Sequence, residues 1–447
     1  MKIKPLPLIL LVLTILMLQA SSIKALSLND RVENAINWIL TRKTTAPKGF
    51  LTINENKLYI EEHASIILAL TLYHKTFTSN CYDEEIKTAL NFILSSQDFL
   101  KKDYPQYYDL ETHKWGPSGK LFYWNAYVIE AFSYAAFQMR YYGNLNESEL
   151  TSWIQATSSI KSFLNVWGDY QETDGSWSFE YNDEHKAKLS ENSALLTGLL
   201  YLALYEHFWG SNSEVLKYVN LAEKTLDWIL SLQEVNPGSW GYGGFYQTKE
   251  KNIQDAYSNA KAAFALNSYL RVIPSLKEDF KPKYYKVREA LTIWVEGFVE
   301  KMLDEYYGVY NARSLLGIIK YPKCVSQSSL VINALIETWI DMGDLKYMDL
   351  ADKILKWLTG ENELKKDLQS FQGGFYKEIQ KTQVTNELSL TTTALALSAL
   401  INSILIGIPE LHSIQPILIL TLTITLFIGK KKFKKRSLKL TRNHKLI

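Results

Sequence analysis

The stretch Asn192-Ser-Ala-Leu-Leu-Thr-Gly-Leu199 decides the fold, because a helix built from it is apolar on nearly every side. Only Thr197 and Gly198 interrupt the apolar run of residues 194–205, and such a helix must be buried all round. The same pattern, one polar residue followed by a run rich in Ala and Leu, recurs along the chain. Its copies begin, 62 to 68 residues apart, at His63, Asn125, Asn192, Asn259, Gln327 and Thr393.

A second kind of helix alternates with the first. Its apolar residues keep helical spacing on one side only, with polar residues on the other. These one-sided segments are Val32–Leu40, Glu84–Leu94, Thr151–Leu164, Leu221–Leu232, Val287–Met302 and Leu350–Leu358. The alternation predicts an all-α fold, an (α/α)6 toroid of six helical hairpins, over residues 28–405. An open solenoid is the alternative, but closing the ring removes the polar end caps that an open array requires.

Both ends of the chain have the composition of targeting segments. Residues 1–27 predict a signal peptide, with two early lysines, an apolar stretch and small residues after it. Ile414–Gly429 is apolar and is followed by six cations in residues 430–436, which is typical of a stop-transfer anchor. We therefore expect a linker and transmembrane helix at 406–429, a basic cytoplasmic tail at 430–447, and an extracytoplasmic toroid on a single-pass membrane protein. An uncleaved signal anchor and a buried final helix are the alternatives.

Composition and motifs exclude several classes of function. A net charge of +2 argues against a nucleic-acid partner, because phosphate binding needs a concentrated basic face. No C-x-x-C or H-E-x-x-H motif occurs, so neither a metal site nor another cofactor is expected. Cys81 and Cys324 fall on opposite faces of the predicted ring, and we expect two free thiols because a disulfide needs Cα atoms within about 7 Å.

Glycine and aromatic residues gather in the connections that lead from one-sided to buried helices, most densely in residues 238–246. Because successive hairpins alternate in direction, all these connections must lie on one face of the ring. The positive ends of the buried helices point to the same face. It also collects carboxylates, namely Glu61, Glu62, Asp174, Glu180, Asp183, Glu184, Glu191, Asp255, Glu378 and Glu387. The sequence therefore predicts an aromatic and acidic central funnel.

Two loop motifs resemble those of a known family. Gln171-Glu-Thr-Asp-Gly-Ser-Trp177 matches the Q-x-x-x-G-x-W repeat of the terpenoid cyclase and protein prenyltransferase toroids, and the range 233–240 matches it with one extra residue. The resemblance implies the toroid fold, in which these motifs tie neighbouring outer helices together. It does not extend to the chemistry: no Asp-x-Asp-Asp motif occurs, and Pro322 stands where a zinc prenyltransferase would have an Asp before Cys324.

The funnel suggests candidate site residues. Asp174 and Glu191 are the preferred catalytic pair, because glycosidases act with two neighbouring carboxylates. His185 is a candidate base for a lyase, with Arg313 as the cation that neutralises the substrate. The residues expected to bind the ligand are Glu62, His63, Trp124, Asn125, Trp177, Asn192, Trp240, Tyr242, Tyr246, Asp255, Asn259, Arg313 and Gln327.

Each of these residue types also has a structural interpretation. Polar residues at helix starts can be caps, an Asp-Gly-Ser sequence favours a turn, and buried Trp residues are commonly packing residues. The sequence therefore leaves open whether the protein is an enzyme. A polysaccharide hydrolase or lyase and a non-catalytic surface receptor are the two main hypotheses. A terpenoid or prenyl enzyme is the third, and it would need an apolar funnel with few charges.

Overall fold

The computed structural model describes residues 26–98, 100–143, 145–181 and 184–406. The predicted signal peptide, transmembrane helix and basic tail lie almost wholly outside these ranges. Within residues 26–406, no helix combines the length and the apolar character needed to cross a membrane. Asn29–Ile406 forms one compact unit, and this unit is described below.

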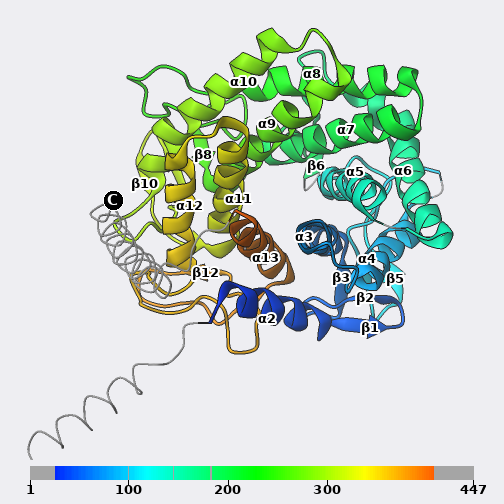
Figure 1. Ribbon diagram of the computed structural model, residues 1–447, viewed down its shortest axis with the longest axis horizontal. Helices are drawn as coiled ribbons and strands as arrows, with labels where there is room; N and C mark the ends of the chain where they lie inside the picture. The colour runs from blue at the N-terminus through cyan, green and yellow to red at the C-terminus, as the bar shows by residue number, and fades with distance from the viewer. Residues whose placement is uncertain (1–25, 99, 144, 182–183, 407–447) are drawn as a thin grey trace, which may run out of the picture. The chain divides into compact units, whose positions relative to one another are not determined.

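Six buried helices form the inner ring of this unit. Each packs against the next, and the last packs against the first, so the ring is closed (Figure 1). The rise of 1.5 Å per residue makes these helices roughly 24–32 Å long. They are α3 (Ile60–Phe77), α5 (Trp124–Tyr142), α7 (Leu189–Trp209), α9 (Ala256–Leu276), α11 (Val325–Met342) and α13 (Leu390–Leu405).

Six one-sided helices surround the inner ring, each preceding its inner partner in the chain (Figure 1). The fifth outer helix continues as a π turn at Val295–Val299 and a 3₁₀ turn at Glu300–Met302. The predicted six-hairpin ring is confirmed for the described part of the chain. The outer helices are α2 (Leu28–Leu40), α4 (Asp83–Ser96), α6 (Glu147–Trp167), α8 (Asn212–Ser231), α10 (Lys281–Trp294) and α12 (Leu345–Leu358).

Short antiparallel strands occupy the connections from outer to inner helices and lie along one rim of the ring. Several pair one connection with the next, as β3 does with β4, β8 with β9 and β11 with β12. The opposite connections are tight turns. The strands are β1 (Lys43–Thr45), β2 (Lys48–Phe50), β3 (Lys57–Tyr59), β4 (Tyr107–Asp109), β5 (Lys114–Trp115), β6 (Phe179–Tyr181), β7 (Glu184–Lys186), β8 (Ile253–Asp255), β9 (Ala312–Ser314), β10 (Gly317–Ile319), β11 (Lys323–Cys324) and β12 (Glu378–Ile379).

In five of the six repeats, the polar residue that opens the repeat fastens its inner helix to the preceding loop. The side-chain oxygen of Asn192 accepts a hydrogen bond from the backbone N–H of Trp177 at 2.8 Å, and its amide donates to the Trp177 carbonyl at 3.0 Å. The same contact joins four other pairs. This polar residue therefore holds loop and helix together, and we call it a latch. These pairs are His63 with Phe50, Asn125 with Tyr104, Asn259 with Phe245, and Thr393 with Phe375.

A glutamine near the end of an outer helix ties that helix to the next one. The Gln171 amide donates to the Leu221 carbonyl of α8 at 3.0 Å. Gly175, with φ +91°, lies so close to α8 that a Cβ there would be 2.1 Å from the Lys224 carbonyl oxygen. The motif's structural role, which the resemblance implied, is thus observed here. Further ties of this kind are Gln97 to Ser159, Gln233 to Ala290, and Gln369 to Arg31.

The second copy of this motif closes differently from the prediction. Gln233 forms a β-bridge with Phe245, twelve residues later in the chain. Gln171 forms its β-bridge with Trp177, only six residues later. Its amide donates to the Gly243 carbonyl at 3.1 Å, and Gly243 packs against Gly297 of the next outer segment. The predicted partner Trp240 therefore lies in an insertion, and Phe245 takes the place of the motif's Trp.

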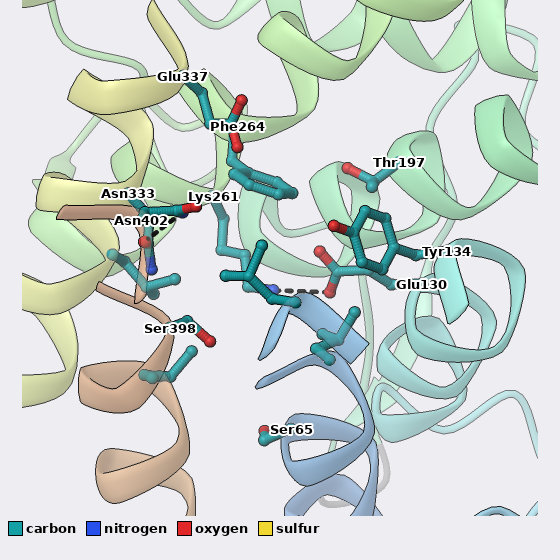
Figure 2. A pocket seen from close by; sticks show the side chains of 14 residues that line it. Ser65, Glu130, Tyr134, Thr197, Lys261, Phe264, Asn333, Glu337, Ser398 and Asn402 are labelled. Carbon is teal, nitrogen blue, oxygen red and sulfur yellow. Dashed lines mark hydrogen bonds and ion pairs between the residues drawn. The ribbon is translucent and has the colours of Figure 1, made fainter. Parts of the chain in front are cut away.

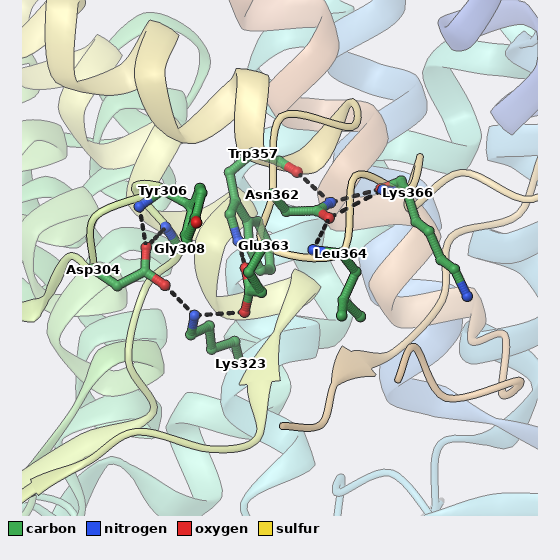
Figure 3. A network of polar contacts seen from close by, with 9 residues as sticks. All are labelled: Asp304, Tyr306, Gly308, Lys323, Trp357, Asn362, Glu363, Leu364 and Lys366. Carbon is green, nitrogen blue, oxygen red and sulfur yellow. Dashed lines mark hydrogen bonds and ion pairs between the residues drawn. The ribbon is translucent and has the colours of Figure 1, made fainter. Parts of the chain in front are cut away.

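An ionic network replaces the glutamine in the fifth hairpin, where Leu303 occupies the corresponding position. Lys323, almost fully buried, contacts the carboxylates of Asp304 and Glu363, the latter at 2.6 Å (Figure 3). Glu363 also accepts a hydrogen bond at 3.0 Å from the ring N–H of Trp357, on α12. The loop after α10 is thereby joined to α12 by charge instead of an amide.

Both cysteines are free thiols, as predicted. Cys81 is exposed in the turn after α3, and Cys324 lies at the start of α11. Burial, and then the Glu378 carboxylate whose oxygen is 3.8 Å from its sulfur, raise the pKa of the Cys324 thiol to about 12. Cys324 is therefore protonated at neutral pH and is a poor nucleophile.

Candidate functional site

The axis of the ring contains two chambers, one above the other. The upper chamber lies toward the strand-bearing rim and has a cavity volume of about 280 Å³. This volume is close to the lower end of the range of small-molecule sites. The side chains that give the upper chamber its chemistry are Glu61, Tyr123, Tyr127, Glu130, Tyr257 and Lys261.

The lower chamber has a cavity volume of only about 60 Å³, and its surface is mainly apolar; Figure 2 shows the side chains that line it. Leu72, Phe264 and Leu330 are among its lining residues. Several polar groups there already have partners: the Asn402 amide donates to the Asn333 side-chain oxygen at 2.9 Å, and Glu337 forms an ion pair with Arg271. The lower chamber therefore offers few free hydrogen-bonding groups to a ligand.

A buried ion pair separates the two chambers. The Lys261 ammonium of α9 lies 2.6 Å from the Glu130 carboxylate of α5, across the axis (Figure 2). Glu130 is 2% exposed and Lys261 6% exposed, and both residues line both chambers. A charge this deeply buried is tolerated only when it is paired, so each of the two groups requires the other. The pair forms the floor of the upper chamber.

Two further carboxylates lie at the upper chamber, both in the first turn of an inner helix. Glu61 on α3 lines the chamber, and Glu191 on α7 lies beside it, with its oxygens accepting hydrogen bonds from Ser190 at 2.8 Å and Tyr127 at 3.4 Å. Burial, and then the negative charge of Glu191, raise the pKa of Glu61. Two carboxylates in unequal environments are a common arrangement for a proton donor and a proton acceptor.

Tyrosines supply the remaining polar surface of the upper chamber. Burial, followed by the charges of neighbouring carboxylates, raises the pKa values of Tyr127, Tyr181 and Tyr257 well above the usual value for a phenol. These phenols stay neutral and can donate hydrogen bonds. The rings of Tyr123 and Tyr181 stack with their centroids 4.7 Å apart and an angle of 4° between their planes. The chamber can therefore both stack on a flat ligand and hydrogen-bond to it.

The predicted catalytic residues are not brought together. Asp174 forms an ion pair with Lys249 and accepts hydrogen bonds from Ser176 in its turn; burial raises its pKa, but these contacts outweigh burial and lower it. His185 is 63% exposed on β7, where it contacts the buried Glu180 at 2.8 Å. Among the described residues, neither belongs to the lining of either axial chamber. Glu191 is not a lining residue either, but it accepts a hydrogen bond at 3.4 Å from Tyr127, which lines the upper chamber.

Most of the predicted ligand-binding residues hold the loops in place instead. Asn125, Asn192 and Asn259 are fully buried latches, and their side-chain amides are occupied by backbone groups. His63 accepts from the Phe50 N–H at 2.9 Å and contacts the Tyr59 carbonyl at 2.6 Å; burial lowers its pKa to about 4. We therefore correct the assignment of these four residues from ligand binding to structure.

Trp124, Trp177 and Arg313 are likewise structural. The ring N–H of Trp124 donates to the Tyr104 carbonyl at 2.7 Å, and the fully buried Trp177 donates to Thr225 at 3.2 Å. The Arg313 guanidinium is almost fully buried, donates to the Gln254 side chain and to three backbone carbonyls, and has its pKa lowered to about 10 by burial. Arg313 is therefore unable to reach a ligand.

The other predicted ligand-binding residues lie on the strand-bearing rim outside the described chamber lining. Burial raises the pKa of Glu62 to about 7, and the carboxylate accepts a hydrogen bond from Thr52. Asp255 caps α9 by accepting from the Ser258 N–H at 2.7 Å. The rest have local partners: Trp240 packs edge-on against Tyr246, Tyr246 donates to Glu234, Tyr242 lies under the Lys301 ammonium, and Gln327 donates to Asn311.

The chamber contains residues that the sequence patterns did not single out as site residues. Glu130 and Lys261 are charges within otherwise apolar runs, and Tyr127 and Tyr257 lie near the starts of the same helices. In a helix that is buried all round, a lone charge must face another buried charge or the axis of the ring. That rule, applied to each repeat, could have found Glu130 and Lys261.

Comparison with known proteins gives the fold and no family. No protein-family model matches the chain, and no curated protein sequence matches it. Among solved structures, it is similar to a sugar epimerase from a ruminal bacterium, with a TM-score of 0.64, 12% identity, and coverage of 83% of this chain and 98% of that one. It is also similar to cellobiose 2-epimerase from Bacillus thermoamylovorans B4167, with a TM-score of 0.63, 10% identity, and coverage of 83% and 98%.

A third similar structure is a glycoside hydrolase family 76 mannosidase from Bacteroides thetaiotaomicron VPI-5482, with a TM-score of 0.58, 13% identity, and coverage of 85% of this chain and 98% of that one. These neighbours share the ring over almost their whole length. At 10–13% identity, the likeness shows the fold alone.

Proposed function

We propose that the chain binds a saccharide in the upper chamber and acts on it by proton transfer between the sugar and the carboxyl groups of Glu61 and Glu191. The observation that carries the proposal is the arrangement of two carboxyl groups and several neutral tyrosines around one axial chamber. Solved structures with a similar ring, described as sugar epimerases and a mannosidase, support a saccharide as the ligand.

The two carboxyl groups have different roles in this proposal. Glu61, whose pKa burial and Glu191 raise, keeps its proton longer and acts as the acid. Glu191 accepts hydrogen bonds from Ser190 and Tyr127 and acts as the base. Hydrolysis and acid–base isomerisation both need such a pair. Tyr257 would donate a hydrogen bond to a sugar hydroxyl, while the Tyr127 O–H is directed to Glu191.

The geometry disfavours two of the chemistries considered from the sequence. Elimination on a uronic acid needs a cation at the substrate carboxylate, and Arg313 is held by backbone carbonyls of the loop between α8 and α9. A terpenoid ligand would need an apolar chamber, whereas this one contains Glu61, Glu130 and Lys261. Hydrolysis or isomerisation of a saccharide is the chemistry that remains.

The test combines binding and turnover on a panel of oligosaccharides. We expect Glu191→Gln to lower turnover by roughly 10²–10⁴-fold, the usual contribution of a general acid or base. Glu84→Gln is the matched control, because the Glu84 side chain is 77% exposed on the outer helix α4. Binding without turnover by the wild type would make the protein a carbohydrate receptor. Absence of binding across the panel would overturn the proposal.

We also propose, from the sequence alone, that the protein is exported and held at the membrane by residues 406–429. The support is the apolar stretch Ile414–Gly429 and the six cations that follow it. The full chain should then sediment with membranes after an alkaline wash. A chain that ends at residue 405 should be released; retention of the shorter chain would overturn this assignment.

A further inference from the structure

The upper chamber contains more negative than positive charge. Its one lining cation among the described residues is Lys261, and the Glu130 carboxylate already neutralises it. Glu61 and Glu191 remain, and within the described ranges neither forms an ion pair with a Lys, Arg or His side chain. A further cation, the Lys188 ammonium, lies 3.6 Å from the centroid of the Tyr181 ring. An incoming ligand therefore meets two carboxyl groups that nothing in contact with them neutralises.

The walls of the same chamber are aromatic. Tyr123, Tyr127 and Tyr257 line it, and Tyr181 stacks on Tyr123. The face of an aromatic ring attracts a cation, and the attraction is stronger where water is excluded. Tyrosine rings combined with carboxylates are suited to holding an ammonium group. They are poorly suited to holding an anionic ligand.

We propose that the saccharide recognised by this chamber carries a free ammonium group, as an unacetylated amino sugar does, and that this group lies between Glu61, Glu191 and the tyrosine rings. The inference rests on the proposed function and adds the class of sugar. A neutral sugar leaves the Glu191 carboxylate without an ionic partner beside Glu61. A uronic acid adds a further negative charge next to it, which is unfavourable in a partly buried site. An ammonium group can pair with the Glu191 carboxylate and donate hydrogen bonds to the Glu61 carboxyl oxygens.

Lys261 belongs to the floor of the upper chamber, and this is consistent with an ammonium group on the ligand. Because its ammonium is held 2.6 Å from Glu130, the lysine is not available to bind a sugar carboxylate. The pair also closes the way to the apolar lower chamber, and both partners line both chambers. The ammonium group of the ligand would thus remain above the floor, at the level of Glu61 and Glu191.

Titration calorimetry on the detergent-solubilised full chain tests the inference with three oligosaccharides of equal length. These are a glucosamine oligomer at a pH where its amine is protonated, its N-acetylated form, and a galacturonic acid oligomer. We expect the glucosamine oligomer to bind at least ten-fold more tightly than the N-acetylated form, and the uronic acid to bind most weakly. Glu61→Gln and Glu191→Gln should each reduce this preference, while Glu84→Gln should keep it.

Each result bears on the inference. Equal affinities for the amine and its N-acetylated form would overturn the ammonium site and leave the saccharide proposal standing. Tighter binding of the uronic acid would overturn it as well. Absence of binding by all three oligomers and by the wider panel would overturn the proposed function and this inference together. A preference that survives both Gln variants would show that the ammonium group binds elsewhere.

Discussion

At the scale of single residues, the neighbours Glu62 and His63 show how burial changes the proton balance of the fold. Both lie in the first turn of α3 and are shielded from solvent. Burial raises the pKa of Glu62 to about 7 and lowers that of His63 to about 4, because in each case the charged form loses its hydration. The two residues therefore respond oppositely to pH.

The raised pKa of Glu62 predicts that the folded protein loses stability as pH rises. Its pKa is 4.5 in the unfolded chain and about 7 in the fold, so the folded state holds the proton between these values. Stability then falls from about pH 4.5 until the pH passes about 7, by at most about 3 kcal/mol at about 1.4 kcal/mol per pKa unit. Glu62→Gln should remove this fall. Urea denaturation of both proteins at pH 5 and pH 8 measures it, and His63 cancels in the difference. Equal pH dependence in wild type and variant would refute the assignment.

The sequence predicted the location of polar residues better than their roles. The position of Asn192 at the start of a buried helix was correctly identified, but the same position suits a latch and a ligand contact equally well. The choice depends on whether the Trp177 backbone lies within hydrogen-bonding distance, and this is a tertiary property. Asp174 illustrates the same limit, since a turn and an active-site loop both favour an Asp before Gly175.

At the scale of elements, the ties between neighbouring outer helices hold the wall of the ring together. Gly175 adopts φ +91° and touches the backbone of α8, while Gly119 adopts φ +88° and has nothing within 4 Å of the Cβ position. An alanine would introduce the same backbone strain at either glycine. Only at Gly175 would its Cβ also clash with the backbone of α8. The two glycines form a matched pair for measuring the tie.

Gly175→Ala should therefore destabilise the fold more than Gly119→Ala. The shared backbone strain costs about 1–2 kcal/mol. The clash with the Lys224 carbonyl adds to it, so that we expect Gly175→Ala to cost at least about 3 kcal/mol in total. Chemical denaturation of the two variants gives the comparison. If both lose the same stability, the close approach of this loop to α8 does not contribute to the wall.

The elements themselves were largely predictable, because two hydrophobic periodicities alternate along the chain. The outer and inner helices lie where the one-sided and all-apolar segments were expected. A further signal is a buried Trp near the end of five outer helices, at Trp38, Trp167, Trp228, Trp294 and Trp357. The insertion after Gln233 was not predictable, since the spurious match at Gly238 and Trp240 had nearly the right spacing.

At the scale of the whole molecule, closure of the ring joins the first outer helix to the last loop. Arg31 on α2 forms two contacts with the Asp367 carboxylate, at 2.7 and 2.9 Å, and its carbonyl accepts from Gln369 at 2.8 Å. Gly373, with φ +99°, lies against the Asn34 backbone. These contacts span more than 330 residues of sequence.

Arg31→Ala should weaken this closure. The Arg31 side chain is 3% exposed, but the Asp367 left behind is 35% exposed, so we expect a loss of about 1–3 kcal/mol, below that for a fully buried pair. Lys353→Ala is the control, because the Lys353–Asp349 pair is solvent-exposed on one helix and contributes about 0.5 kcal/mol or less. Thermal and urea unfolding of the two variants measures the difference. A loss no larger than that of the control would mean that other contacts close the ring.

The axial chamber was the least predictable feature of the whole molecule. A helix that is apolar all round has no amphipathic stripe, so its sequence does not indicate which side faces the axis. Only the closed ring brings Glu61, Glu191 and Tyr257 from three separate repeats to one chamber. The acidic and aromatic character of that face was predicted, and so were Glu61 and Glu191, whereas Glu130, Lys261, Tyr127 and Tyr257 were not.

A crystal structure of the protein with its tightest-binding oligosaccharide tests the central claim most directly. We predict that one sugar unit lies in the upper chamber, with its polar groups on Glu61 and Glu191 and its ring against the tyrosines. The Glu130–Lys261 pair should remain intact below it. A sugar bound on the outer loops, near Asp174 or His185, with the chamber free of ligand, would contradict the account.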